Sequence, residues 1–168
     1  IRSADALTSV IEFQKPIVNF EMPPKGVTVV TGAASGLGRA LALQLAPIRQ
    51  RLILVDRNKA ALEKLRQHIS NAEIQVLDLA CEDEIKALID SLYREEAFVA
   101  ELYACAGLGF RGEHVSIPLE RHLETLQVNL TARLHLLSVL LPEMCRRHFG
   151  RIVLISSSSA FQPLPLMA

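Results

Sequence analysis

A glycine-rich turn at residues 31–38 has the composition of a loop that binds phosphate groups. It reads Thr31-Gly32-Ala33-Ala34-Ser35-Gly36-Leu37-Gly38. Glycines allow a sharp turn and let the backbone approach a pyrophosphate, and the N–H groups of a helix that starts here would face the phosphates. The turn therefore predicts dinucleotide binding. The alternative is a tight turn that serves packing alone.

An acidic residue, Asp56, follows the next β-branched run at the distance that a dinucleotide site requires. A carboxylate about 20 residues beyond the turn can bond both hydroxyls of a ribose, and it would repel a 2′-phosphate. We therefore expect NAD as the cofactor and NADP less readily. Two neighbouring cations, Arg57 and Arg39, would soften this preference by supplying positive charge. The competing interpretation is that Asp56 only caps the following helix.

From Gly26 onward, short β-branched runs alternate with longer amphipathic stretches, which is the pattern of successive βαβ units. The predicted strands are residues 27–30, 51–55, 74–77, 99–104 and 152–155. The predicted helices are residues 36–46, a helix capped by Asn58 and ending at Ile69, one that begins near Glu82, and a long one from 119 to 144 or 147. Pro142 is expected to bend the long helix or to end it early.

These elements predict an α/β fold, a three-layer, doubly wound, Rossmann-like parallel sheet with strand order 3-2-1-4-5. Right-handed crossovers give this order and place the ligand crevice at the carboxyl ends of the strands, near the switch between strands 1 and 4. Residues 1–25 have no strong period and are interpreted as a leader or linker. Residues 26–168 are interpreted as one NAD(P)-binding domain.

Composition argues against several other classes of protein. Lys plus Arg and Asp plus Glu both number 18, so no net charge favours nucleic acid or an anionic membrane. The three cysteines lack the paired spacing of a zinc site or a disulfide framework, and the five histidines form no metal motif. The N-terminus does not resemble a signal peptide, and prolines interrupt the apolar C-terminal run. We expect a cytoplasmic protein with no metal, no nucleic acid and no membrane partner.

The spacing Thr31-Gly32-x-x-x-Gly36-x-Gly38 resembles that of the classical short-chain dehydrogenase/reductase family, and the resemblance extends from about Lys25 to the end of the chain. It implies an NAD(P)-dependent oxidoreductase that moves hydride between a nicotinamide and a small hydroxyl or carbonyl substrate. It also implies cofactor contacts from Thr31, Gly32, Ser35, Gly36, Leu37, Gly38, Asp56 and Arg57. A methyltransferase with a nucleoside cofactor is a weaker alternative, because its glycine spacing would differ.

Two later motifs extend the implied cofactor site. Asp78-Leu79 resembles the family's adenine contact, although a simple turn at the end of a strand would explain it too. Cys105-Ala106-Gly107 matches the family's Asn-Ala-Gly motif except that Cys replaces Asn, which would loosen the polar contacts of the central strand. Cys105 is interpreted as a small buried residue rather than a nucleophile, because no histidine is near it in sequence.

The resemblance assigns catalytic roles to Asn129 and Ser157. The backbone carbonyl of Asn129 would hold a water molecule in a proton relay, and the Ser157 hydroxyl would bond the substrate carbonyl oxygen. The competing interpretations are an ordinary asparagine on a helix surface and a serine-rich loop without chemistry.

The chain ends at Ala168, and the family's Tyr-x-x-x-Lys motif would begin just beyond it. Loss of a general acid–base group costs about 10²–10⁴ in rate, so we expect the chain by itself to be inactive or nearly so. The alternative is a catalytically dead dinucleotide-binding or scaffold protein. Analogy with the family and the apolar fifth strand lead us to expect a homo-oligomer, a dimer or a tetramer.

Overall fold

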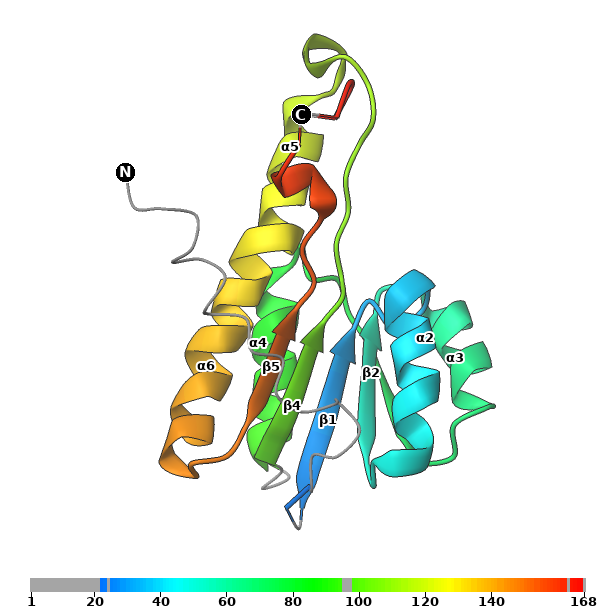
Figure 1. The fold of residues 1–168 in the computed structure, drawn as a ribbon, viewed down its shortest axis with the longest axis vertical. Coiled ribbons are helices and arrows are strands. Elements are labelled where there is room, and N and C mark those ends of the chain that lie inside the picture. The colour runs from blue at the N-terminus through cyan, green and yellow to red at the C-terminus, as the bar shows by residue number, and fades with distance from the viewer. Residues whose placement is uncertain (1–21, 24, 95–97, 163, 168) are drawn as a thin grey trace, which may run out of the picture.

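The computed structural model describes residues 22–23, 25–94, 98–162 and 164–167. Five parallel strands form one sheet in the order β3-β2-β1-β4-β5, which confirms the predicted fold class and strand order (Figure 1). The strands are β1 (Gly26–Thr31), β2 (Leu52–Asp56), β3 (Ala72–Val76), β4 (Phe98–Ala104) and β5 (Arg151–Leu154). The predicted leader lies outside the described residues except for Met22, Pro23 and Lys25.

Helices cover both faces of the sheet, and the central strands β1, β2 and β4 are buried along nearly their whole length. The helices are α2 (Gly36–Leu45), α3 (Lys59–Arg66), α4 (Glu82–Arg94), α5 (Leu119–Leu126) and α6 (Ala132–Arg146). Side chains of α2 and α3 pack with Val30 on one face, and side chains of α4 and α6 pack with Val29 on the other. Neighbouring residues of one strand thus contribute to two separate hydrophobic clusters.

The pairing register brings the predicted site residues to one edge of the sheet. Thr31, the last residue of β1, pairs with Val55 of β2 and with Ala104 of β4. Because all five strands are parallel, the turn after β1, Asp56 and Cys105 all emerge at the carboxyl edge. This is the edge at which open α/β sheets bind ligands.

The predicted long helix differs from the observed one. A π-helical turn, Gln127–Thr131, separates α5 from α6. Of the two effects expected of Pro142, an early end does not occur, because α6 continues to Arg146, inside the predicted bounds of 144 to 147. Leu140 and Met144 on either side of the proline are buried against the sheet, and this packing holds the helix together where Pro142 lacks an N–H donor.

A buried ion pair, which the sequence did not predict, links the loop after α2 to the central strand β4. The Arg49 guanidinium donates to the Glu101 carboxylate at 2.6 and 2.9 Å, and the two residues are 4% and 0% exposed. The Thr28 hydroxyl donates to the same carboxylate at 2.9 Å, and Tyr103 donates at 3.3 Å. Several donors therefore satisfy the hydrogen-bonding capacity of the buried Glu101 carboxylate.

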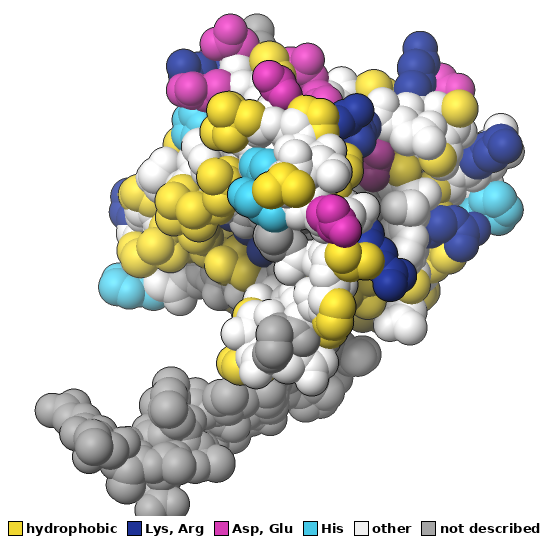
Figure 2. Space-filling view, turned by 90° about the horizontal axis from the view of Figure 1, so that it is seen from above, with side chains coloured by type: hydrophobic (Ala, Val, Ile, Leu, Met, Phe, Trp, Pro, Cys, Tyr) yellow, Lys and Arg dark blue, Asp and Glu magenta, His cyan; other side chains and the backbone are white. Residues whose placement is uncertain are grey.

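Charges of both signs are mixed with hydrophobic side chains on the molecule seen from above, which agrees with the zero net charge (Figure 2). In the described part of the chain, no helix is both long enough and apolar enough to cross a membrane. Across the same residues, His, Cys, Asp and Glu side chains form no group of three that is suited to a metal ion.

Candidate functional site

A cavity of about 300 Å³ opens at the carboxyl edge where β1, β2 and β4 meet. It brings together the three glycines of the turn, the acidic residue that ends β2 and the motif after β4. The predicted cofactor residues that line it are Gly32, Ser35, Gly36, Leu37, Gly38, Asp56, Arg57, Asp78, Leu79, Cys105, Ala106 and Gly107. Predicted residues from four separate chain segments therefore line one cavity.

The three glycines of the turn meet different steric requirements. Gly32 has a φ of +67°, and a Cβ there would lie 2.8 Å from the backbone of Ala106. A Cβ on Gly38 would lie 2.2 Å from the carbonyl oxygen of Gly32. Gly36 has a φ of +48°, but a Cβ there would meet nothing within 4 Å. Gly32 and Gly38 thus permit close backbone packing, whereas Gly36 borders open space that a ligand can fill.

The N-terminus of α2 faces this space and fits an anionic group. Ser35 is the N-cap residue, and its side chain makes no capping hydrogen bond to the helix. Unpaired N–H groups in the first turn and the helix dipole both favour a negative charge here. The turn is therefore suited to the diphosphate of a dinucleotide.

The Asp56 carboxylate contacts the glycine-rich turn directly. Its Oδ2 accepts a hydrogen bond from the N–H of Ala34 at 3.0 Å, and its Oδ1 accepts one from the N–H of Asn58 at 2.9 Å. Asn58, rather than Asp56, caps α3, because its Oδ1 accepts from the N–H of Ala61 at 3.1 Å. A carboxylate has about four acceptor positions, so Asp56 retains capacity for further donors.

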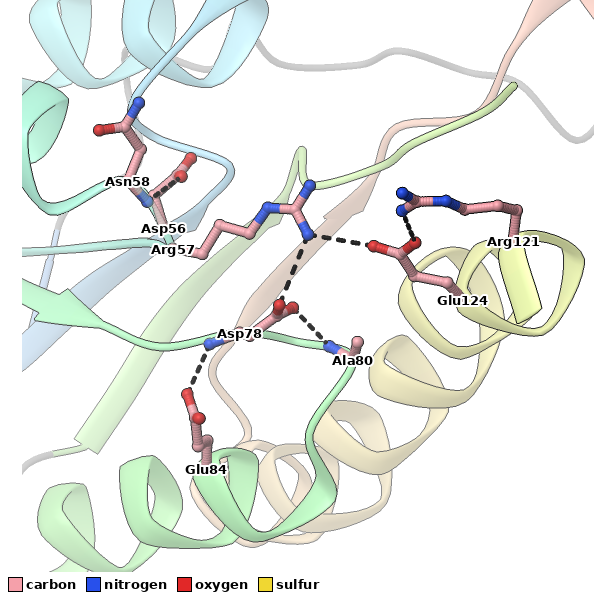
Figure 3. Close-up of polar contacts among 8 residues, drawn as sticks. All are labelled: Asp56, Arg57, Asn58, Asp78, Ala80, Glu84, Arg121 and Glu124. Carbon is pink, nitrogen blue, oxygen red and sulfur yellow. Dashed lines mark hydrogen bonds and ion pairs between the residues drawn. The ribbon is translucent and has the colours of Figure 1, made fainter. Parts of the chain in front are cut away.

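The segment after β3 also lines the cavity. Asp78 Oδ1 accepts from the N–H of Ala80 at 2.9 Å, which is the local turn that the simpler interpretation predicted. Its Oδ2 lies 3.5 Å from the Arg57 guanidinium (Figure 3). Leu79 is buried and presents an apolar surface to the cavity. Asp78 and Leu79 therefore both form a turn at the end of β3 and line the cavity.

Thr31 lies beneath the cavity rather than in its lining. It is buried, and its hydroxyl accepts from the N–H of Ala106 at 3.2 Å, which ties β1 to the loop after β4. Arg133 of α6 adds a second tie: it donates to the carbonyl oxygens of Ala106 at 2.8 Å and Ile155 at 2.7 Å. These bonds hold the segments that follow β4 and β5 in place next to Cys105.

Cys105 is half-buried next to both of these bonds. Burial raises the pKa of its thiol, and the charge of Arg133 lowers the pKa to a smaller extent. The thiolate is the nucleophilic form of cysteine, so a raised pKa keeps the neutral, unreactive form at neutral pH. This supports the interpretation of Cys105 as a packing residue.

The two predicted catalytic residues lie in a second, adjoining cavity of about 720 Å³. Asn129 sits in the π-helical turn, and its side chain makes a pair of bonds with the backbone of Leu108: it accepts at 2.9 Å and donates at 2.7 Å. Ser157 is exposed, and its hydroxyl oxygen lies 2.7 Å from that of Ser159. Cys105, Gly107 and Leu108 line both cavities, so the two spaces are contiguous.

Several residues of these cavities were not predicted from the sequence. Leu77, Leu108 and Val128 line the first cavity; Phe110, His122 and Arg133 line the second. These residues belong to loops and helices. Which of their side chains line a cavity depends on how the helices pack on the sheet, and no local motif marks them. The turn at 127–131 aims Asn129 at Leu108 and is visible only in three dimensions.

Comparison with known proteins links this geometry to one family. A family model described as short chain dehydrogenase matches residues 26–168. The chain is 29% identical over 168 residues to 17-beta-hydroxysteroid dehydrogenase 13 of Mus musculus, covering 94% of this chain and 55% of that protein. It is 31% identical over 138 residues to epidermal retinol dehydrogenase 2 of Mus musculus, covering 79% of this chain and 45% of that protein. The chain thus spans about half the length of these relatives.

Solved structures with bound cofactors have the same fold. A metagenomic short-chain oxidoreductase in complex with NADP has a TM-score of 0.79 at 31% identity, over 86% of this chain and 67% of that one. NAD⁺-bound xylitol dehydrogenase has a TM-score of 0.76 at 29% identity, over 85% of this chain and 57% of that one. These neighbours include both nicotinamide cofactors.

Proposed function

The chain belongs to the short-chain dehydrogenase family, and we propose on that premise that it binds a nicotinamide dinucleotide, with NAD preferred, in the cavity beside the glycine-rich turn. When bound there, the nicotinamide would supply or accept the hydride that is exchanged with a small hydroxyl or carbonyl substrate. The observation that carries the proposal is the contact of the Asp56 carboxylate with Ala34 inside the turn. This contact supports the proposal because it brings the carboxylate that would bind the ribose next to the turn that would bind the phosphates.

The preference for NAD rests on charge. The Asp56 carboxylate would accept hydrogen bonds from two ribose hydroxyls but would face a 2′-phosphate with like charge. Asp78 adds a second carboxylate to the same cavity. Both cofactors occur among the similar structures, so the choice must follow from these side chains rather than from the fold.

Substrate would occupy the second cavity, which shares lining residues with the first. The Ser157 hydroxyl is exposed there and would donate to the substrate oxygen. The side chain of Asn129 is engaged with Leu108, so its proposed contribution is through its backbone carbonyl, to which a water molecule would donate.

A leucine-rich surface supports self-association, and we propose a dimer or a tetramer. Exposed leucines follow α5 and α6 at helical spacing: Leu119, Leu123, Leu126, Leu130, Leu134 and Leu141. A monomer would leave this apolar stripe in water. Sedimentation velocity should show a species larger than the monomer, and a single monomeric boundary at all concentrations would refute this part of the proposal.

Calorimetric titration of the folded chain with NADH tests the cofactor site directly. We expect saturable heat with one site per chain, and weaker binding of NADPH. An absence of heat with both nucleotides, on protein whose circular dichroism shows the folded state, would overturn the proposed function. The test requires no turnover and so depends only on the residues that form the first cavity.

A further inference from the structure

The side chain of Arg57 reaches away from Asp56 and across the rim of the first cavity. Its Nη1 donates to Glu124 Oε1 at 3.1 Å, and the same nitrogen lies 3.5 Å from Asp78 Oδ2 (Figure 3). Glu124 belongs to α5, 67 residues further along the chain, and it does not line the cavity. A carboxylate outside the proposed cofactor site therefore holds a cation that borders it.

Glu124 is itself held in position. Arg121, one turn earlier in α5, donates to Glu124 Oε2 at 2.9 Å, and its guanidinium lies over the ring of Phe110 at 5.2 Å from the ring centroid. Hydrogen bonds from Arg121 and then from Arg57 lower the pKa of Glu124, so it is ionised at neutral pH. Each oxygen of the carboxylate has its own guanidinium partner, which fixes the oxygen that Arg57 contacts (Figure 3).

The position of Arg57 matters because of what else surrounds the cavity. Among the described residues that line it, Arg57 is the single Lys or Arg, whereas Asp56 and Asp78 are both acidic. A 2′-phosphate carries close to two negative charges and would need a cation to offset these carboxylates. Arg57 could act in that way only by leaving Glu124.

We propose that Glu124 is a positioning residue for cofactor choice: by holding Arg57 in an ion pair on the α5 side of the cavity, it withholds the cation that NADP would need. This inference rests on the proposed function, and it names a residue that would set the preference between NAD and NADP at that site. Asp56 would disfavour the 2′-phosphate directly, and Glu124 would do so by pairing with Arg57, the Lys or Arg among the described lining residues.

The size of the effect follows from exposure. The side chains of Arg57 and Glu124 are 57% and 19% exposed, so the pair is weak and can be broken by a competing anion. Releasing Arg57 should therefore tighten NADPH binding by about threefold to tenfold, and not by orders of magnitude. NADH has no phosphate at this position, and its Kd should change by less than about twofold.

The test measures the Kd of NADH and NADPH by fluorescence titration for the wild-type chain and Glu124→Gln. Glu143→Gln is the matched control, because Glu143 is also held by two arginines, Arg146 and Arg147, but lies in α6 outside both cavities. We expect the ratio of the two Kd values to shift toward NADPH in Glu124→Gln and to stay constant in Glu143→Gln. Glu124→Ala replaces Glu124→Gln should the amide variant not fold.

Two further results decide between explanations. In the double variant Arg57→Gln/Glu124→Gln the gain in NADPH affinity should disappear, because no cation remains to be released. A gain that persists without Arg57, or an unchanged ratio in Glu124→Gln with NADH still bound, would overturn the inference and leave the proposed function intact. Failure of the wild-type chain to bind either nucleotide would overturn both.

Discussion

The Asp56 carboxylate accepts a hydrogen bond from the N–H of Ala34, which lies 22 residues earlier in the glycine-rich turn. This contact joins the end of β2 to the turn that follows β1. Its second oxygen accepts from Asn58 at the start of α3, so one side chain orients both loops. The remaining acceptor capacity of the carboxylate faces the cavity lined by the turn.

Asp56→Asn should weaken NADH binding by about 10- to 100-fold. Hydrogen bonds to a charged acceptor contribute about 1.5–3 kcal/mol, and the amide loses both the charge and one acceptor oxygen. Isothermal titration measures the change. Asp90→Asn removes the same charge from the exposed side of α4 and should leave the Kd unaltered. Equal binding by Asp56→Asn and the wild type would contradict a ribose contact.

Gly36→Ala and Gly38→Ala should have different effects: the first should reduce NADH affinity, and the second should reduce the stability of the fold. A Cβ at position 36 meets open space and adds only the cost of the positive φ, about 1–2 kcal/mol, but it enters the place proposed for the diphosphate. We expect this variant to fold and to lose at least tenfold in NADH affinity. A Cβ at position 38 collides with the Gly32 carbonyl, so that variant should unfold at much lower temperature. Thermal melts followed by titration distinguish them, and normal NADH binding by Gly36→Ala would be the adverse result.

Cys105 should be alkylated by iodoacetamide more slowly than Cys145. Burial raises the pKa of the Cys105 thiol, so its thiolate fraction at neutral pH is below that of an ordinary cysteine and rises only at more alkaline pH. Cys145 is exposed and serves as the internal comparison. Peptide mass spectrometry across a pH series gives both rates, and bound NADH should slow Cys105 further. Equal rates at neutral pH would count against this account.

Glu101→Gln should destabilise the fold by about 3–5 kcal/mol, because the Arg49 charge would stay buried without its carboxylate. The matched control is Glu73→Gln. Arg51 donates two hydrogen bonds to the Glu73 carboxylate, at 2.5 and 2.8 Å, but the Glu73 side chain is 45% exposed. That control should cost no more than about 1 kcal/mol. Urea denaturation measures both, and similar midpoints for the two variants would contradict the buried network.

Much of the site follows from patterns that are local in the sequence. The turn at 31–38, Asp56 and the strand endings were placed by runs of apolar residues and by glycine spacing, and parallel strands with right-handed crossovers then force them to one edge. The bounds of the last long helix were predicted, but the π-helical turn inside it at Gln127–Thr131 was not. Pro142 should end a helix by local rules, but Leu140 and Met144 packed against the sheet outweigh that preference.

The sequence alone determined the order of the strands and the presence of a nucleotide-type turn with an acidic partner, because periodicity and steric rules act over short stretches of chain. Only the tertiary structure decided that Arg57 lies against Glu124, that Asn129 pairs with Leu108 and that Arg49 is buried with Glu101. The partners in these contacts are separated by 67, 21 and 52 residues. Charged and amide side chains have no partner preference that is encoded locally, so the packing of the helices on the sheet selects which of them meet.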